Sequence, residues 1–326
     1  MKAIVCDELG LPSQLKFKEI ENLIPKENEV VVSVKACAVN FPDTLIIQGK
    51  YQLKPDMPFT PGSDIAGVVK SIGSNVKHLK IGDEVFGFVN YGGFAEEVIV
   101  NKRQVFPKLP DMSFELACSF MLAYGTSYHA LKDRAKLLDG ETLLVLGASG
   151  GVGLAAVELG KLMGAKVIAA ASTQEKLKLC KKYGADETIN YSTEDLKSRV
   201  KELTEGKGVD VVYDPVGGNY SEPALRATAW EGRYLVVGFA AGEIPKIPLN
   251  LPLLKGCQVV GVFWGNFMMK DVSKGMTNSM ELMQMFSQNK IKPHIQKIYN
   301  LEDTPKALED MMARKVMGKI VVKVES

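Results

Sequence analysis

The sequence has few of the residues that build disulfide frameworks and metal centres. It contains five cysteines and three histidines in 326 residues, and no two cysteines form a C-x-x-C pair. An odd number of scattered cysteines argues against a disulfide framework, so we expect reduced thiols that are mostly buried. A zinc site needs about four N, S or O ligands that converge in tetrahedral geometry. The histidines, at positions 78, 129 and 294, do not have the spacing of such a site, so we expect no bound metal.

Long apolar runs and an excess of one charge are also absent. No apolar run approaches the roughly 18 residues of a membrane helix, and the first residues lack the apolar stretch of a secretory signal. The formal net charge is only +2, which gives no electrostatic reason to expect nucleic acid or an anionic membrane as a partner. We therefore expect a cytoplasmic protein that acts on a small molecule.

What the chain does have is a glycine-rich turn between two apolar segments. Residues 142–147 are a short apolar run of buried-strand length, residues 148–153 read ASGGVG, and the next residues have apolar side chains at helical spacing up to Gly164. A second apolar run follows at 166–171. This order predicts a strand, a glycine turn, a helix and a second strand.

The turn matches the pattern that binds the pyrophosphate of a dinucleotide. The pyrophosphate needs close backbone approach and free N–H groups at a helix N-terminus, where the helix dipole favours negative charge. In the G-x-G-x-x-G fingerprint, Ala148 replaces the first glycine, and Gly150 and Gly153 supply the second and third. An ordinary strand-to-helix turn is the alternative, but the flanking strands favour a dinucleotide site made of Ala148, Ser149, Gly150, Gly151, Val152 and Gly153.

The pattern along the chain predicts an α/β protein with two domains. Residues 1–122 hold short β-like runs separated by Gly, Pro, Asn and Asp, which predicts a compact antiparallel β-barrel. Residues 123–262 alternate strands with helices, which predicts a doubly wound Rossmann domain with six parallel strands. Residues 263–326 hold two helices and a final strand at 319–324, which we expect to return to the first domain.

Residues after the second of these parallel strands favour NADPH over NADH. NAD-selective sites place an acidic residue about 20 positions beyond the glycines, where it binds the ribose 2′-OH. This chain has Ser172 there, with Lys176 one helical turn onward and Tyr191 after the third strand. Hydroxyl and ammonium donors suit a 2′-phosphate. The alternative for Lys176 is a solvated helix lysine, and the neighbouring Glu175 partly offsets its charge.

Other cofactor contacts are expected after the later strands, because doubly wound sheets bind ligands outside the carboxyl ends of their strands. Small residues at these points let a ligand approach the backbone. Trp264 either closes over the nicotinamide or fills a gap between the domains. The candidates after the fourth, fifth and sixth strands are Gly217, Gly238, Phe239, Phe263, Trp264 and Gly265.

Motifs across nearly the whole chain resemble those of one known family. They are AVNFPD at 38–43, PGSDIAG at 61–67, GDEV at 82–85, GGFAE at 92–96, YGT at 124–126, ASGGVG at 148–153 and DPVGG at 214–218. In this order they resemble the zinc-independent quinone oxidoreductases related to zeta-crystallin, within the medium-chain dehydrogenase/reductase superfamily. The resemblance implies a GroES-like catalytic barrel joined to a Rossmann domain.

Compared with the zinc-dependent members of that superfamily, this chain lacks the metal ligands. Those members carry Cys-His-x-Asp in the first loop and Gly-His-Glu in the second, where this chain has Asn40 and Phe41, and SD at 63–64. The resemblance implies that Asn40 and Tyr51 line the quinone pocket and that Thr126 lies near the nicotinamide. The alternatives are a turn residue for Asn40 and a surface aromatic for Tyr51.

Without a metal, the chemistry must suit an acceptor that is already electron-poor. NADPH would supply hydride to a quinone or another α,β-unsaturated carbonyl compound, and hydrogen-bond donors would stabilise the charge that develops on its oxygen. Asp43 and Asp64 are expected to brace their loops, with the final proton taken from solvent. The alternatives are an enoyl-thioester reductase and a non-catalytic NADPH-binding sensor or structural protein. The apolar sixth strand, at the sheet edge, and the resemblance together imply a homodimer.

Overall fold

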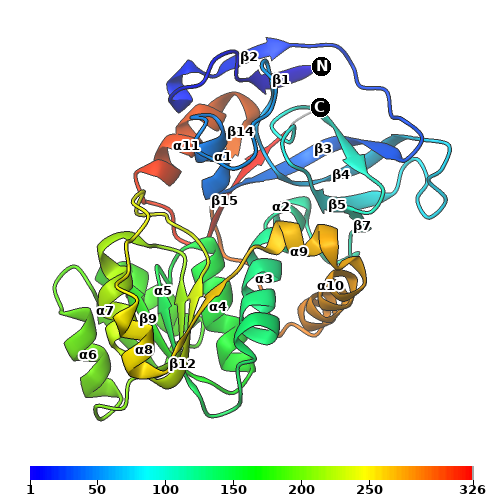
Figure 1. The fold of residues 1–326 in the computed structure, drawn as a ribbon. Coiled ribbons are helices and arrows are strands. Elements are labelled where there is room, and N and C mark those ends of the chain that lie inside the picture. Colours follow the sequence, from blue (N-terminus) through cyan, green and yellow to red (C-terminus); the bar gives the residue numbers. More distant parts are fainter. Residues whose placement is uncertain (325–326) are drawn as a thin grey trace. The chain divides into compact units, whose positions relative to one another are not determined.

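The computed structural model describes residues 1–324 and divides the chain into two compact units. The first unit contains Met1–Leu122 and the segment from Pro293 onward, and the second contains Ala123–Lys292. Figure 1 shows the returning segment, in orange and red, beside the blue and cyan strands of the first unit. The expected third segment, 263–326, is therefore divided, because residues 263–292 belong to the second unit.

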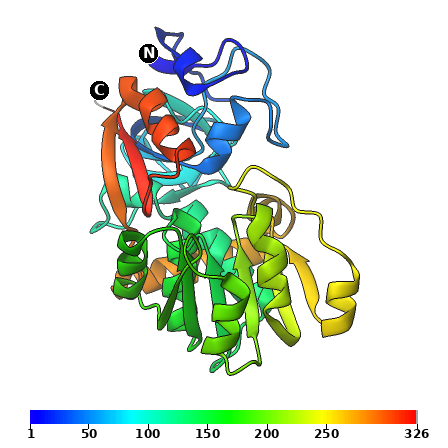
Figure 2. The ribbon, with the colours of Figure 1, turned by 90° about the vertical axis from the view of Figure 1, so that its left-hand side faces the viewer.

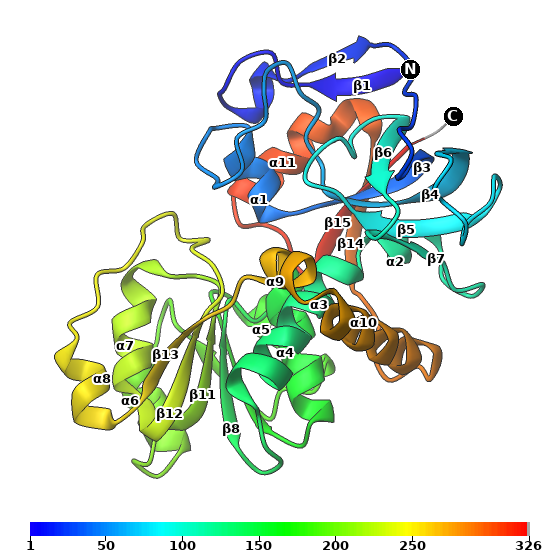
Figure 3. The same ribbon diagram turned by 45° about the vertical axis from the view of Figure 1, so that its right-hand side comes forward.

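The second unit is built on a six-stranded parallel sheet, which confirms the predicted doubly wound fold. The strand order is β10-β9-β8-β11-β12-β13, and every neighbouring pair is parallel. Figure 3 shows four of these strands, β8, β11, β12 and β13, side by side. The strands are β8 Thr142–Leu146, β9 Lys166–Ala171, β10 Glu187–Asn190, β11 Val209–Asp214, β12 Thr228–Val236 and β13 Gln258–Gly261.

Helices connect these strands, and one of them is shorter than expected. The sequence predicts a helix over 221–230, but α7 ends at Arg226 and β12 already begins at Thr228, which pairs with Val209 of β11.

None of the helices in residues 1–324 is long and apolar enough to span a membrane. The helices are α3 Met121–Tyr128, a π-helical turn His129–Ala135, α4 Gly151–Leu162, α5 Gln174–Lys182, α6 Leu196–Leu203, α7 Ser221–Arg226, α8 Asn250–Lys255, α9 Trp264–Lys270 and α10 Val272–Ser287.

The first unit is built on a mostly antiparallel sheet with the order β14-β15-β3-β4-β5-β7, and β6 pairs with β3. The final strand β15 returns to this sheet, as predicted, and it lies antiparallel to β3 and parallel to β14. Figure 2 shows β15 and β14 as a red and an orange strand. The strands of this sheet are β3 Glu29–Val39, β4 Asp64–Ile72, β5 Glu84–Phe88, β6 Glu97–Asn101, β7 Val105–Pro107, β14 Ile295–Asn300 and β15 Lys319–Lys323.

Smaller elements complete the first unit, and each unit has its own apolar core. Strands β1 Lys2–Val5 and β2 Lys16–Glu19 form a two-stranded sheet. The helices are α1 Phe41–Ile46, α2 Phe114–Cys118 and α11 Thr304–Met312. All five cysteines are buried and free, as their number and spacing predict.

Candidate active site

The turn between β8 and α4 uses its glycines in three different ways. Gly147 has a φ of +56°, a left-handed conformation that favours glycine, and it redirects the chain after β8. A Cβ at Gly153 would lie 2.3 Å from the Gly147 carbonyl oxygen, so Gly153 allows the helix to pack closely on the turn. A Cβ at Gly150 would meet the same oxygen at 3.4 Å, and Ala148 and Ser149 are buried beneath the turn. The fold therefore does not need glycine at position 150, whereas a ligand on the turn would.

The N-terminus of α4 is suited to an anion. Gly150 is its N-cap and has no side chain to cap the N–H groups at 151–153. The helix dipole adds partial positive charge at this end. Ser127 of α3 braces the first turn, because its hydroxyl donates to the Val152 carbonyl at 2.8 Å and shares a 2.9 Å hydrogen bond with the Tyr213 hydroxyl. No sequence motif points to Ser127, since a single buried serine in a helix has no distinctive spacing.

Ser172, Lys176 and Tyr191 are neighbours at the carboxyl ends of β9 and β10. Lys176 Nζ donates to Ser172 Oγ at 3.3 Å. Thr173 caps α5 by accepting a 3.3 Å hydrogen bond from the Lys176 backbone N–H, which fixes where the helix begins. The backbone N–H of Tyr191 donates to the Ala171 carbonyl at 3.2 Å, so the ends of the two strands lie side by side. The side chains of Ser172 and Lys176 are thus in contact, and the backbone of Tyr191 lies beside the end of β9, while its ring packs against Tyr220 with the ring centroids 4.4 Å apart.

Asp214 shapes the loop that follows β11. Its buried carboxylate accepts from the Gly217 backbone N–H and from the Ser221 hydroxyl, both at 2.8 Å, and its carbonyl accepts from the Gly238 N–H at 3.3 Å. Gly217 has a φ of +70°, and a Cβ there would lie 2.9 Å from the Phe239 ring. The loops after β11 and β12 therefore pack closely, and both stand at the carboxyl edge of the sheet.

The residues after β13 differ in exposure. Phe263 is 56% exposed, whereas Trp264 is 6% exposed. A Cβ at Gly125 of α3 would lie 2.8 Å from the Trp264 indole, so this side chain packs α9 on α3. Thr126 and Gly265, which adjoin this contact, are partly buried. Trp264 thus has a packing role within the second unit, and the two roles expected for it from the sequence stay predictions.

In the first unit, Asn40 stands at the start of α1 and at the centre of a polar cluster. Asp43 Oδ2 accepts from the Asn40 backbone N–H at 2.7 Å, which caps the helix. The Asn40 amide Nδ2 lies 3.2 Å from Asp64 Oδ2 and 3.5 Å from Ser63 Oγ. Lys319 Nζ donates to Asn40 Oδ1. We refer to these five residues as the Asn40 cluster.

Lys319 brings a buried positive charge to the Asn40 cluster. It begins β15, is 4% exposed, and its Nζ lies 3.7 Å from Asp64 Oδ2. Burying an ammonium group is costly unless acceptors and opposite charges surround it. Lys319 is not among the residues predicted from the sequence, although a lysine directly before a short apolar run (KIVVK) is a signal. The cluster is therefore held by charge as well as by hydrogen bonds.

Burial shifts the acidity of both carboxyl groups in the cluster. Burial raises the pKa of Asp43 to about 7, reinforced by the charge of Asp64 and opposed by the Asn40 N–H and Lys319. Burial also raises the pKa of Asp64 to about 6, against the lowering effect of Lys319 and Asn40. These carboxyl groups therefore titrate near neutral pH instead of near pH 4.

Tyr51 lies close to the Asn40 cluster without joining it. Its side chain is partly buried and packs against the apolar core of the first unit. Burial, together with the charge of Asp43, raises the pKa of the Tyr51 hydroxyl. Tyr51 is therefore more than a surface aromatic, although no hydrogen bond within residues 1–324 ties it to the cluster.

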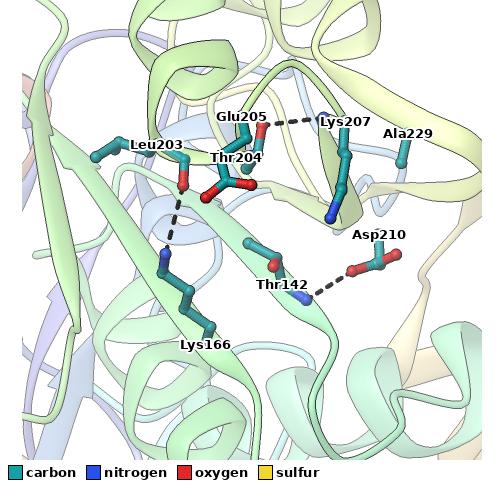
Figure 4. Close-up of a pocket in the computed structure, with 9 residues that line it drawn as sticks. Thr142, Lys166, Leu203, Thr204, Glu205, Lys207, Asp210 and Ala229 are labelled. Atoms are coloured by element: carbon teal, nitrogen blue, oxygen red, sulfur yellow. Dashed lines mark hydrogen bonds between the residues drawn. The ribbon is translucent and has the colours of Figure 1, made fainter.

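A hollow of about 270 Å³ lies at the amino ends of the parallel strands (Figure 4). Its lining includes Thr142 at the start of β8 and Lys166 at the start of β9. Figure 4 shows the Thr142 N–H donating to the Asp210 carboxylate at 2.7 Å and Lys166 Nζ donating to the Leu203 carbonyl at 3.3 Å. Doubly wound sheets bind ligands at the opposite, carboxyl edge. This hollow is therefore not the dinucleotide site.

Two family models match the chain, one in each unit. The alcohol dehydrogenase GroES-like domain matches residues 26–111, and the zinc-binding dehydrogenase model matches residues 151–282. Together with the six-stranded parallel sheet and the glycine turn, these matches define a protein of the medium-chain dehydrogenase/reductase class.

Individual relatives narrow the class. A quinone oxidoreductase-like protein 2 homolog from Nematostella vectensis is 40% identical over 325 residues, which cover 98% of this chain and 88% of that protein. Escherichia coli quinone oxidoreductase complexed with NADPH has a TM-score of 0.94 at 31% identity and covers 99% of this chain and 100% of its own. A mycobacterial protein complexed with NADPH has a TM-score of 0.93 at 29% identity, with coverage of 99% and 100%. This chain therefore belongs to the quinone oxidoreductase family.

The Asn40 cluster does not offer the donors that zinc prefers. Protein zinc sites use cysteine, histidine and carboxylate ligands in tetrahedral geometry. The cluster supplies an amide, a hydroxyl and two carboxyl groups, and the Lys319 ammonium lies 3.7 Å from one of the carboxylate oxygens. No group of three or more His, Cys, Asp and Glu side chains in residues 1–324 is arranged to hold a metal ion. The residues present thus do not fit the metal named in the second family model.

Proposed function

We propose that this chain is an NADPH-dependent, zinc-free oxidoreductase that transfers hydride to quinones or other α,β-unsaturated carbonyl compounds. The observation that carries the proposal is the turn at the N-terminus of α4, where the fold itself does not require glycine at position 150. Residues 148–153 would hold the pyrophosphate through backbone N–H groups and the helix dipole. Gly217, Gly238, Phe239, Phe263, Trp264 and Gly265, at the carboxyl edge of the same sheet, would surround the rest of the dinucleotide.

The preference for NADPH rests on the residues that follow β9 and β10. Ser172 Oγ and Lys176 Nζ are 3.3 Å apart, so a hydroxyl group and an ammonium group follow β9, where an NAD-selective site has a carboxylate. The backbone of Tyr191 adjoins the end of β9, and its hydroxyl group would be the third donor. A 2′-phosphate would accept hydrogen bonds from all three. Two similar solved structures contain NADPH, which supports the same choice.

Asn40, Tyr51 and Thr126 are the proposed contacts of the acceptor and the nicotinamide. When bound, NADPH would supply the hydride. The Asn40 amide and the Tyr51 hydroxyl would donate hydrogen bonds to the acceptor oxygen, where negative charge develops as hydride arrives. Lys319 donates to Asn40 Oδ1, and Asn40 Nδ2 lies 3.2 Å from Asp64 Oδ2 and 3.4 Å from the Ala38 carbonyl, so the amide would exchange one of these two partners for the acceptor oxygen. This arrangement would replace a Lewis acid by fixed donors.

Binding and turnover test the proposal separately. We expect NADPH to bind at least about tenfold more tightly than NADH, which corresponds to roughly 1.4 kcal/mol from the 2′-phosphate contacts. Fluorescence titration with each nucleotide measures this ratio, and equal affinities would contradict the NADPH assignment. Turnover is measured as NADPH consumption with a panel of quinones, enones and enoyl thioesters.

The same panel discriminates the alternatives. Turnover with enoyl thioesters alone would favour an enoyl-thioester reductase. Tight NADPH binding without turnover of any acceptor would favour a non-catalytic sensor or structural protein. The names of the relatives support the quinone assignment, so we expect quinones to be the best acceptors.

We further propose a homodimer that pairs through β13. This strand ends the parallel sheet, and Val259 within it is 47% exposed. The preceding helix α8 and its N-cap also present exposed apolar side chains, with Leu249 at 84% and Leu253 at 76%. Light scattering should give twice the chain mass, and Leu253→Glu should shift the protein toward monomer. The cytoplasmic location expected from the sequence stays a prediction.

A further inference from the structure

The Asn40 cluster contains more acidic groups than its cation can balance. Asp43, Asp64 and Lys319 are all at most 4% exposed. Lys319 pairs with Asp64 at 3.7 Å, and no ion pair within residues 1–324 includes Asp43. A buried carboxylate without a countercharge is strongly disfavoured and takes up a proton instead. The charge count thus leaves one proton in the cluster at neutral pH.

Geometry indicates which carboxyl group holds that proton. Asp43 Oδ2 accepts from the Asn40 backbone N–H at 2.7 Å, and Oδ1 lies 3.4 Å from Ser63 Oγ. Both partners are neutral, so a proton on Oδ1 meets no opposing charge and can be donated to the Ser63 hydroxyl. Asp64 has the ammonium group beside it and is better able to stay ionised. No donor within residues 1–324 reaches Asp64 Oδ1, so this carboxylate depends on Lys319 and Asn40 for its stabilisation.

Ser63 is the member of the cluster that reaches the surface. Its side chain is partly exposed, whereas Asn40, Asp43, Asp64 and Lys319 are buried. A hydroxyl group can accept a proton on one side and donate one on the other. Ser63 is therefore placed to pass a proton from the buried carboxyl group to whatever contacts the Asn40 amide.

We propose that Asp43 is a buried proton store and that Ser63 delivers its proton to the reduced acceptor. This inference rests on the proposed function, because it supplies the proton that hydride transfer leaves missing. Hydride transfer to the β-carbon of an enone produces an enolate. The enolate then takes the hydroxyl proton of Ser63, so a bond to this hydrogen forms as the O–H bond of Ser63 breaks. Ser63 Oγ takes the Asp43 proton in the same step. Asp43 is left as a carboxylate, and solvent returns its proton before the next turnover.

The groups around Asp43 support this assignment. Burial and the charge of Asp64 raise the pKa of Asp43 to about 7, against the lowering effect of the Asn40 N–H and Lys319, and this value is close to the working pH of a general acid. Cys37 of β3 and Cys118 of α2 face the cluster as neutral thiols, because burial raises the pKa of each. The Tyr51 hydroxyl, whose pKa burial also raises, stays neutral as well. Asp64 and Lys319 are thus the charged neighbours that act on Asp43.

Infrared titration tests the store without any turnover. Exposed carboxyl groups, with pKa values near 4, are already ionised at pH 6. We expect a protonated-carboxyl carbonyl band in the wild type that is lost between pH 6 and pH 8, with one component from Asp43 that disappears at about pH 7 and one from Asp64 that disappears at about pH 6. Asp43→Asn should lack the component at about pH 7 and keep the Asp64 component. Asp83→Asn is the matched control, since Asp83 also accepts from a backbone N–H, at 2.9 Å from Lys80, but is partly exposed. Identical spectra for wild type and Asp43→Asn would overturn the proposal.

Kinetics test the delivery. At pH 6, Asp43→Asn and Ser63→Ala should each lower kcat for an enone by about 10²-fold with NADPH affinity unchanged, and Ser63→Thr should restore most of it. The wild-type kcat should fall above about pH 7, where Asp43 is ionised, whereas the kcat of Asp43→Asn should not change there. A wild-type kcat in Ser63→Ala would overturn the role of Ser63. If the wild type reduces no acceptor, the proposed function fails, and the infrared titration alone decides whether Asp43 stores a proton.

Discussion

The glycine turn of the second unit and the Asn40 cluster of the first unit differ in the groups that they present, because the turn presents backbone groups and the cluster presents side chains. The turn offers backbone N–H groups and a helix dipole, and it works because side chains are missing at positions such as Gly150. The cluster is built mainly from side chains, and it buries two carboxyl groups with one ammonium group. A site made of backbone groups depends little on the neighbouring side chains. In a cluster of charged side chains, by contrast, the loss of one member changes the charge balance of all the others.

Lys319→Met should have the largest effect, because it removes the cation from the cluster. We expect a loss of about 3 to 5 kcal/mol in the free energy of unfolding at pH 8, where two uncompensated carboxylates would be buried. The loss should be smaller at pH 5, where both carboxyl groups are protonated. Urea denaturation at the two pH values measures this difference. The double variant Lys319→Met/Asp64→Asn should recover part of the loss, and equal losses at both pH values would show that charge is not the cause.

Gly150→Val and Gly153→Ala should separate binding from folding within the turn. Valine at position 150 would occupy the pyrophosphate position, so NADPH affinity should fall by about 100-fold, or roughly 2.8 kcal/mol, while the fold survives. Alanine at position 153 would place a Cβ 2.3 Å from the Gly147 carbonyl oxygen, so it should lower stability. Nucleotide titration and thermal unfolding of both variants give the comparison. Wild-type NADPH affinity in Gly150→Val would show that this glycine serves the turn alone.

Asp43→Asn should change how stability depends on pH. The pKa of Asp43 is raised in the folded state, so the folded chain binds a proton that the unfolded chain has released between about pH 4 and pH 7. Stability from this group is therefore greatest below pH 4 and declines as pH rises through about 7. Relative to wild type, the variant should gain roughly 1 to 3 kcal/mol on going from pH 4 to pH 8. Parallel pH profiles for the two proteins would contradict a raised pKa.

Lys176→Ala should have the smallest effect of these variants, and this effect should be confined to the binding of NADPH. Loss of one ammonium contact to the 2′-phosphate should weaken NADPH binding by about tenfold, or roughly 1.4 kcal/mol, and leave NADH binding unchanged. Lys178→Ala is the control, because Lys178 lies on the same helix and is exposed. An equal loss for both nucleotides would place Lys176 outside the 2′-phosphate site.

The two regions also differ in how well the sequence predicts them. The turn is contiguous, and strand, glycines and helix appear together within residues 142–164, so its form could be predicted before the structure. The Asn40 cluster joins residues from α1, the start of β4 and the start of β15, which no local pattern connects. Lys319 was missed for this reason.

The end of α7 and the unit to which residues 263–292 belong also differ from the prediction, because contacts distant in sequence determine both. No Gly or Pro separates α7 from β12, so only the pairing of Thr228 with Val209 shows where the helix stops. The segment 263–292 was expected to return to the first unit. Instead, the Phe267 ring stacks on His129 at 3.9 Å and the Asn278 amide donates to Asp133 at 2.8 Å, which ties α9 and α10 to the second unit. Contacts between residues far apart in the sequence thus decide which unit a segment belongs to, and local sequence patterns do not reveal such contacts.

The return of β15 to β3 also sets the order in which the chain can be completed during synthesis. The second unit is continuous in sequence, whereas the first lacks β14 and β15 until the second has been made. Until then, β3 keeps an unpaired edge toward β15, and Asp43 and Asp64 have no cation. Unpaired edges and incomplete cores are the points at which nascent chains associate wrongly or engage chaperones. The first unit is therefore the part of this protein that stays vulnerable longest on the ribosome.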